Sequence, residues 1–117
     1  MAVKRILVIG SASIVASLAI ATAAQAAYTA TATLYGTDVK VLSVLECKAV
    51  ATSSQSDDRG ATTEAEGYPC SSVSVKVFYQ NSSGYYGWSS TDTDLKKAVV
   101  VLSGSNQLQN TYNTATR

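Results

Sequence analysis

The chain has 117 residues, with nine basic and eight acidic side chains, two cysteines and no histidine. A nearly neutral chain without a basic run argues against nucleic acid or an anionic membrane surface as a partner. The lack of histidine excludes Ser-His and Cys-His nucleophilic catalysis and removes a common metal ligand. We therefore expect no enzyme activity, no metal site and no cofactor.

The first 26 residues have the pattern of a secretory signal peptide of bacterial type. Lys4 and Arg5 form a basic start, and residues 6–24 carry no charge. The small-x-small pattern at 24–26 predicts cleavage after Ala26, with cleavage after Ala24 as the alternative. An uncleaved membrane anchor is the alternative, because the uncharged run is nearly long enough to span a bilayer. The run is rich in alanine and serine and therefore only mildly hydrophobic. We predict a signal helix over 1–26 that is removed by cleavage.

Residues 27–117 are then a single small β domain in a secreted, extracellular protein with no stable membrane anchor after cleavage. A core of this size is marginal, so a covalent crosslink matters. Cys47 and Cys70 are expected to form a disulfide, because two cysteines in an exported chain most often pair with each other. Closing a loop of about 24 residues stabilises such a domain by roughly 3 kcal/mol.

Two segments show the alternation that is typical of β-strands. In 71–79, valines alternate with serines and a lysine, which is the clearest strand signature of the chain. In 28–35, threonines alternate with Ala30, Ala32 and Leu34, and these three side chains are expected to face inward.

Residues 39–51 are predicted to form one longer strand. Its positions 39, 41, 45, 47, 49 and 51 are all apolar or cysteine, so they are expected to face inward, Cys47 among them. A helix is the competing interpretation, because the leucines and Glu46 suit one. Residues 52–67 lack a large apolar side chain and are expected to form a long solvated loop, with the disulfide at its base.

The second half of the chain is predicted to contain a hairpin and further short strands. Residues 80–88 are predicted to form a turn followed by an aromatic strand, which forms a hairpin with 71–79. Residues 91–97 suit either the start of a short helix or a polar hairpin loop. Residues 98–102 are predicted to form a buried strand, and the polar tail 105–117 is expected to add an edge strand or to fray.

These elements predict an all-β fold. Five to six short strands separated by turns are typical of a small antiparallel sandwich or open barrel, here with one disulfide and preceded by the signal helix.

The aromatic cluster Tyr85, Tyr86 and Trp88 is the one patch with a specific binding hypothesis. In a strand, Tyr86 and Trp88 share a face and Tyr85 lies on the other. Exposed aromatic faces stack on sugar rings and anchor protein interfaces. For Trp88 a core position is the preferred interpretation, because a small domain with one tryptophan usually buries it.

Acidic residues provide the remaining chemistry, in three pairs at 57 and 58, 64 and 66, and 92 and 94. Two carboxylates held across a cleft can hydrolyse glycosides, and several carboxylates at set spacing can bind calcium. These pairs fall in loop-like sequence without such spacing, so solvated acids are the preferred interpretation.

The sequence therefore predicts a secreted, small, non-enzymatic binding or interaction protein whose partner is an extracellular, cell-surface polymer or protein. The alternative is a secreted effector, such as an antibacterial protein or a protease inhibitor that presents the 52–67 loop. A small carboxylate-dependent hydrolase is the third hypothesis.

Overall fold

The computed structural model describes residues 28–117, so the predicted signal peptide of residues 1–26 and its cleavage site lie outside the described range. The strands of this range are β1 (Thr29–Tyr35), β2 (Asp38–Val44), β3 (Cys47–Ser54), β4 (Arg59–Glu64), β5 (Ser72–Gln80), β6 (Tyr86–Trp88), β7 (Asp92–Asp94), β8 (Lys97–Val101) and β9 (Gln107–Thr116).

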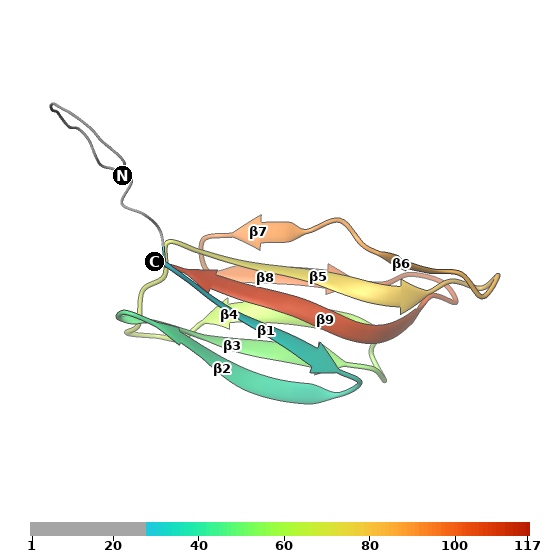
Figure 1. Cartoon of the computed structure of the whole chain (residues 1–117), viewed down its shortest axis with the longest axis horizontal. Helices are drawn as coiled ribbons and strands as arrows, with labels where there is room; N and C mark the ends of the chain where they lie inside the picture. The colour runs from blue at the N-terminus through green and yellow to red at the C-terminus, as the bar shows by residue number, and fades with distance from the viewer. Residues whose placement is uncertain (1–27) are drawn as a thin grey trace, which may run out of the picture.

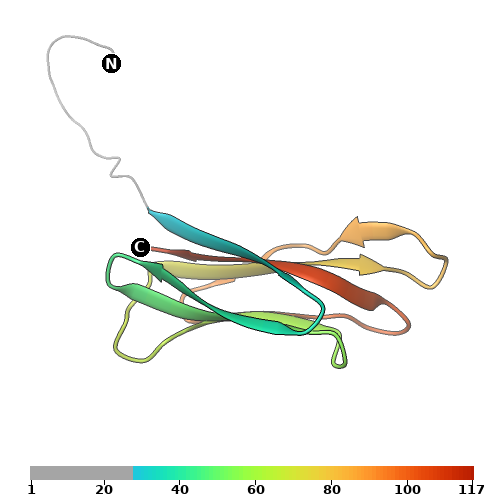
Figure 2. The ribbon, with the colours of Figure 1, turned by 60° about the horizontal axis from the view of Figure 1, so that its bottom comes forward.

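The strands form two antiparallel sheets that face each other, as Figure 1 and Figure 2 show. Sheet A has the strand order β1-β9-β5-β6, and β7 pairs with β5 as well. Sheet B has the order β2-β3-β4-β8. The predicted all-β antiparallel fold is therefore confirmed, and of the two predicted arrangements, a sandwich or an open barrel, the two facing sheets form the sandwich. The described residues contain nine strands instead of five or six.

The two clearest sequence patterns are confirmed as strands. In β5 the three valines at 73, 75 and 77 are fully buried, while the polar residues between them are only partly buried. In β1 the side chains of Ala32 and Leu34 face inward, and the threonines are exposed. Alternation at period two identifies these strands because each has one face against the core and one face toward solvent.

The predicted long strand 39–51 is wrong, because a tight turn at Leu45 and Glu46 divides it into β2 and β3. Val44 pairs with Cys47 across this turn, so the inward parity changes from one strand to the next. The inward side chains are at odd positions in β3, as expected, but at even positions in β2. The valines at 39 and 41 are exposed as a result.

The predicted solvated loop at 52–67 is also wrong. It contains the end of β3, a short turn and β4, whose Gly60, Ala61 and Thr62 are buried. The loop was predicted because 52–67 lacks large apolar side chains. Small residues such as these suit a buried strand that packs close to the opposite sheet. A methyl group on Gly60 would lie 2.7 Å from Thr111 Cγ2 of β9.

Residues 91–97 form β7 and the turn before β8, and no helix is present there. The Asp92 carboxylate accepts a hydrogen bond from the Val99 backbone N–H at 2.8 Å, which links β7 of sheet A to β8 of sheet B. The prediction of a buried strand at 98–102 is confirmed only in part. Ala98 is buried, but β8 lies at the edge of sheet B and Val101 is exposed.

The tail, expected to lie at an edge or to fray, forms β9 between β1 and β5. Its buried Asn113 donates hydrogen bonds to Ala61 O at 2.8 Å and to Thr62 Oγ1 at 2.9 Å. Thr111 Oγ1 donates to Asn113 Oδ1 at 2.6 Å. Buried polar groups are tolerated when they are hydrogen-bonded, and here they join β9 of sheet A to β4 of sheet B.

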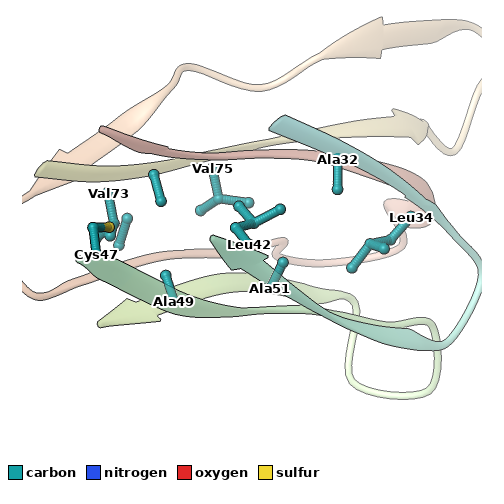
Figure 3. Close-up of a cluster of buried hydrophobic side chains, with 10 residues drawn as sticks. Ala32, Leu34, Leu42, Cys47, Ala49, Ala51, Val73 and Val75 are labelled. Carbon is teal, nitrogen blue, oxygen red and sulfur yellow. The ribbon is translucent and has the colours of Figure 1, made fainter. Parts of the chain in front are cut away.

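Small apolar side chains fill most of the space between the sheets. Figure 3 shows Leu42 and Ala49 on sheet B pointing toward Val73 and Val75 on sheet A. The large share of alanine lets the sheets approach closely, since each alanine projects only a methyl group into the core.

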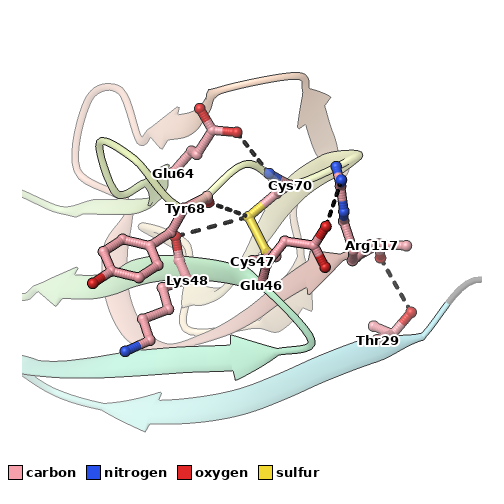
Figure 4. Close-up of a disulfide and its surroundings, with 9 residues drawn as sticks. Thr29, Glu46, Cys47, Lys48, Glu64, Tyr68, Cys70 and Arg117 are labelled. Atoms are coloured by element: carbon pink, nitrogen blue, oxygen red, sulfur yellow. Dashed lines mark hydrogen bonds and ion pairs between the residues drawn. A yellow bond between two sulfur atoms is a disulfide. The ribbon is translucent and has the colours of Figure 1, made fainter.

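The predicted disulfide between Cys47 and Cys70 is confirmed. Cys47 begins β3 of sheet B and Cys70 lies two residues before the start of β5 of sheet A, so the disulfide joins the two sheets at one end, as Figure 4 shows. Next to it, Glu46 and Arg117 form an ion pair at 2.7 Å. Backbone hydrogen bonding at Glu46, followed by the Arg117 guanidinium, lowers the pKa of the Glu46 carboxyl.

Candidate binding surface on the outer face of sheet A

The outer face of sheet A gathers aromatic side chains around one lysine. Lys76 and Phe78 stand on the outward parity of β5, opposite to the buried valines. The short strand β6 brings Tyr86 and Trp88 beside them, and β9 adds Tyr112 from the other side. We call these five residues the aromatic surface.

Phe78 lies at the centre of the aromatic contacts. Its ring centroid is 5.8 Å from that of Tyr86, with the planes only 11° apart, and 5.1 Å from that of Trp88 in a tilted arrangement. Both distances are within the range in which aromatic rings attract each other. Tyr86 is 59% exposed and Trp88 is 44% exposed, so Phe78 holds two rings that remain open to solvent.

Lys76 lies over two of these rings. Its Nζ atom is 4.6 Å from the centroid of Trp88 and 5.6 Å from that of Tyr112. An ammonium group at such distances is attracted by the negative faces of the rings. Lys76 therefore links the aromatic side chains of β6 and β9 across the central strand β5.

A β-bulge lies next to the aromatic surface. Phe78 pairs with Asn110 and Tyr79 with Leu108, which leaves Gln109 outside the ladder. The Gln109 carbonyl instead accepts a hydrogen bond from the Gly36 N–H at 3.0 Å. Bulges bend a strand and increase its twist, so this one changes the shape of sheet A where the aromatic residues stand.

The structure brings together two of the three residues that the sequence singles out. Tyr86 and Trp88 share a face and both contact Phe78, as the alternation predicts. Tyr85 is 73% exposed and precedes β6, and no aromatic pair of the described range includes it. The preferred core position for Trp88 is wrong, because its pairing with Phe78 places it on the outward face of the sheet.

Three residues of the aromatic surface were not identified from the sequence. Lys76 and Phe78 could have been found, because the alternation of 71–79 already places them opposite to the buried valines. Tyr112 could not, since the pairing of β9 with β5 depends on a register that no local pattern reveals.

Several of the acidic side chains have structural hydrogen bonds instead of a shared cleft. The carboxylate of Asp58 accepts from the Leu108 N–H at 3.0 Å, and that of Glu64 accepts from the Cys70 N–H at 2.7 Å. Within residues 28–117, histidine, cysteine and acidic side chains form no group of three that could hold a metal ion. No pocket is found in the same range.

Comparison of the chain with protein-family models, with curated proteins and with solved structures gives no match. Among the described residues there is also no helix with the length and apolar character that crossing a membrane requires.

Proposed function

We propose that this protein is a secreted, non-enzymatic binding protein that uses the aromatic surface to bind a cell-surface polysaccharide. The observation that carries the proposal is the pair of open rings, Tyr86 and Trp88, held on a rigid sheet by Phe78. Sugar rings have apolar faces that stack on such side chains, and rings already held in place lose little conformational entropy on binding.

The side chains around the aromatic surface favour a sugar polymer over a protein partner. One row of outward residues crosses sheet A from Thr31 through Thr114 and Ser74 to Thr93. Hydroxyl groups of this kind pair with sugar hydroxyls. The outward positions of β1, β5 and β9 also carry no valine, leucine or isoleucine, the side chains that would extend the aromatic rings into a broad apolar interface core.

Export is part of the proposal. It is supported by the signal-like segment 1–26 and by the disulfide, which is typical of proteins from oxidising compartments. Intact mass measurement of the protein recovered from culture medium tests it. We expect a mature chain that begins at residue 27, and a chain that retains residues 1–26 would contradict export with cleavage.

The alternative functions have less support. A protease inhibitor that presents 52–67 needs a long exposed loop, and this segment is a hairpin with a buried strand. A hydrolase needs free carboxylates, but those of Asp58, Glu64 and Asp92 accept backbone hydrogen bonds.

Binding of residues 27–117 to a panel of insoluble polysaccharides and isolated cell walls tests the function. We expect Trp88→Ala and Tyr86→Ala each to weaken binding by about tenfold or more, as is usual for central aromatic contacts. Both side chains stand on the outer face of sheet A, outside the core between the sheets, so the thermal midpoint should change little. Tyr68→Ala is the matched control, because Tyr68 is also 44% exposed and contacts Lys48 at 4.6 Å, away from sheet A.

The proposal fails if no polysaccharide or cell wall retains the protein. It also fails if Trp88→Ala and Tyr68→Ala bind equally well, because binding would then not involve the aromatic surface. Retention by a protein fraction of the cell wall that survives glycan digestion would instead identify a protein partner.

A further inference from the structure

The outer face of sheet A has an unusual charge distribution. Strand alternation and register place hydroxyl, amide and aromatic side chains at its outward positions, and Lys76 is the one charged residue among those of β1, β5, β6, β7 and β9. Lys76 stands on β5, which pairs with three other strands of sheet A. A single positive charge therefore lies near the middle of an otherwise uncharged face.

The acidic residues nearest in the fold are turned away from this face. In β7, Thr93 is paired with Ser74, and its neighbours Asp92 and Asp94 have the opposite parity. Their carboxylates accept hydrogen bonds from backbone N–H groups of β8 in sheet B, at 2.8 Å and 3.4 Å. In the described part of the chain the one ion pair joins Glu46 to Arg117, at the disulfide end. Within residues 28–117, Lys76 is thus left without a carboxylate partner.

The ring contacts hold the Lys76 ammonium group at the level of the aromatic surface. Its Nζ lies between Trp88, at 4.6 Å, and Tyr112, at 5.6 Å. Contacts with ring faces do not use up the N–H donors of an ammonium group, so these donors remain for an external acceptor. A sugar ring that stacks on Trp88 would bring its substituents next to this group.

We propose that the ligand is an acidic glycan, and that Lys76 Nζ binds its anionic group while the rings of Trp88 and Tyr86 stack on the sugars. This inference rests on the proposed polysaccharide-binding function. A carboxylate of a uronic acid and a phosphate of a sugar-phosphate or polyol-phosphate polymer share the chemistry that Lys76 recognises. Both accept charge-assisted hydrogen bonds from an ammonium group.

The expected contribution of Lys76 to affinity follows from the partial exposure of the ion pair that it would form. One partly exposed ion pair contributes about 1 kcal/mol, which corresponds to roughly a fivefold to tenfold change in affinity. Salt screens such a contact, because the screening length falls from about 30 Å at 0.01 M to about 3 Å at 1 M ionic strength. Binding of an acidic glycan should therefore weaken with salt, whereas stacking on a neutral glycan should not.

The experiment compares wild type, Lys76→Gln, Lys76→Arg and Lys48→Gln on three probes. These are polygalacturonic acid, a glycerol-phosphate polymer and a neutral β-glucan, each at low and high salt. Lys48 is the matched control, because its Nζ also lies 4.6 Å from a ring centroid, that of Tyr68. The carboxylate and phosphate probes distinguish the two sources of negative charge.

We expect Lys76→Gln to weaken binding to one acidic probe by about fivefold to tenfold and to remove its salt dependence. Binding to the neutral glucan should weaken less than binding to that acidic probe, because the glucan has no anionic group for Lys76 to bind. Lys76→Arg should retain binding, since the guanidinium group keeps the charge and stacks on rings. Lys48→Gln should bind like the wild type.

Two results would overturn the inference while the proposed function stands. The first is wild-type binding through Trp88 that is no stronger to acidic than to neutral glycans. The second is an equal loss on all three probes in Lys76→Gln together with a shifted Trp88 emission, which would show that Lys76 only positions the ring. Failure of all glycans to bind would refute the proposed function itself.

Discussion

Gly60 of β4 faces Thr111 of β9 so closely that a Cβ atom on Gly60 would lie 2.7 Å from Thr111 Cγ2. The added Cβ atom of Gly60 would also lie 3.1 Å from Val75 Cγ2 and 3.2 Å from Val77 Cγ2, both in β5. The distance between the sheets at this point is therefore determined by the absence of a side chain on Gly60.

Gly60→Ala should destabilise the protein by about 1 to 3 kcal/mol, because an extra methyl group in a packed core forces its neighbours to move. Urea unfolding followed by circular dichroism measures the change. Thr111→Ser, which removes Cγ2 but keeps the hydroxyl, should recover part of the loss in the double variant. Gly87→Ala is the control with no expected loss, since nothing lies within 4 Å of its added methyl group. Equal midpoints for the two alanine variants would contradict the close contact.

Asn113→Ala should cost about 2 to 4 kcal/mol. The substitution removes the donor for the Ala61 carbonyl and the acceptor for the Thr111 hydroxyl, and both groups stay buried. Chemical unfolding provides the measurement. A cost below 0.5 kcal/mol, roughly that of an ordinary surface substitution, would show that the hydrogen bonds between the sheets contribute little.

Asn113→Asp adds a pH-dependent test of the same network. An ionised carboxylate cannot donate to the Ala61 carbonyl, so the folded state should favour the protonated carboxyl and raise its pKa above the unfolded value of about 3.9. The variant should be most stable below that value and should lose stability relative to wild type as the pH rises through the raised pKa. The expectation would be contradicted by a constant difference in unfolding free energy between wild type and Asn113→Asp from pH 3 to pH 8, roughly the range over which the carboxyl changes from protonated to ionised.

Replacement of both Cys47 and Cys70 by alanine should lower the free energy of unfolding by about 3 kcal/mol, because the disulfide closes a loop between residues 23 positions apart. Since it also joins the two sheets, the loss should appear in one cooperative transition. Differential scanning calorimetry with and without reductant checks this. Reductant should destabilise the wild type and leave the double variant unchanged, and a double variant as stable as the wild type would refute the expectation.

Leu45→Gly should stabilise the protein by about 0.5 to 1 kcal/mol. Leu45 has a φ of 53° in the turn between β2 and β3, where a non-glycine residue is strained and glycine is not. Asp58 has a φ of 50° as well, but its carboxylate accepts from the Leu108 N–H, so Asp58→Gly should show no gain. Unfolding midpoints of the two variants give the comparison. A loss of stability in Leu45→Gly would mean that the exposed leucine makes contacts that outweigh its strain.

The strands with one clearly apolar face could be predicted from the sequence. The valines of 71–79 and the alternating pattern of 28–35 each reveal their inward side, because burial of one face imposes a period of two. The disulfide followed from the cysteine count. The division of 39–51 could not be predicted, because a leucine occupies the turn position where glycine is the usual signal.

A strand whose buried side chains are small or polar cannot be recognised from its own sequence as part of the core. β4 lies in the core with glycine, alanine and threonine, and β9 contributes a buried asparagine whose side-chain N–H groups donate to partners in the other sheet. The exposure of Trp88 likewise depends on the pairing of β6 with the outward side of Phe78. The candidate site was therefore predicted in part, through two of its five residues. The alternation of 71–79 also places Lys76 and Phe78 on the outward face, whereas Tyr112 requires the register of a distant strand.

The backbone of Tyr28 and that of Arg117 exchange hydrogen bonds at 3.1 Å and 2.9 Å, so both described ends meet at the disulfide end of the sandwich. Tyr35 at the far end of β1 lies in the same row across sheet A as Phe78, because both residues pair with Asn110 of β9. Tyr35 is six residues from the start of β1, which corresponds to about 20 Å at the usual rise of a strand. A protein coupled to a sensor chip or a bead through Arg117 would hold its aromatic rings away from the support. Such an oriented preparation would leave the whole outer face of sheet A free to meet a polymer too large to diffuse beneath it.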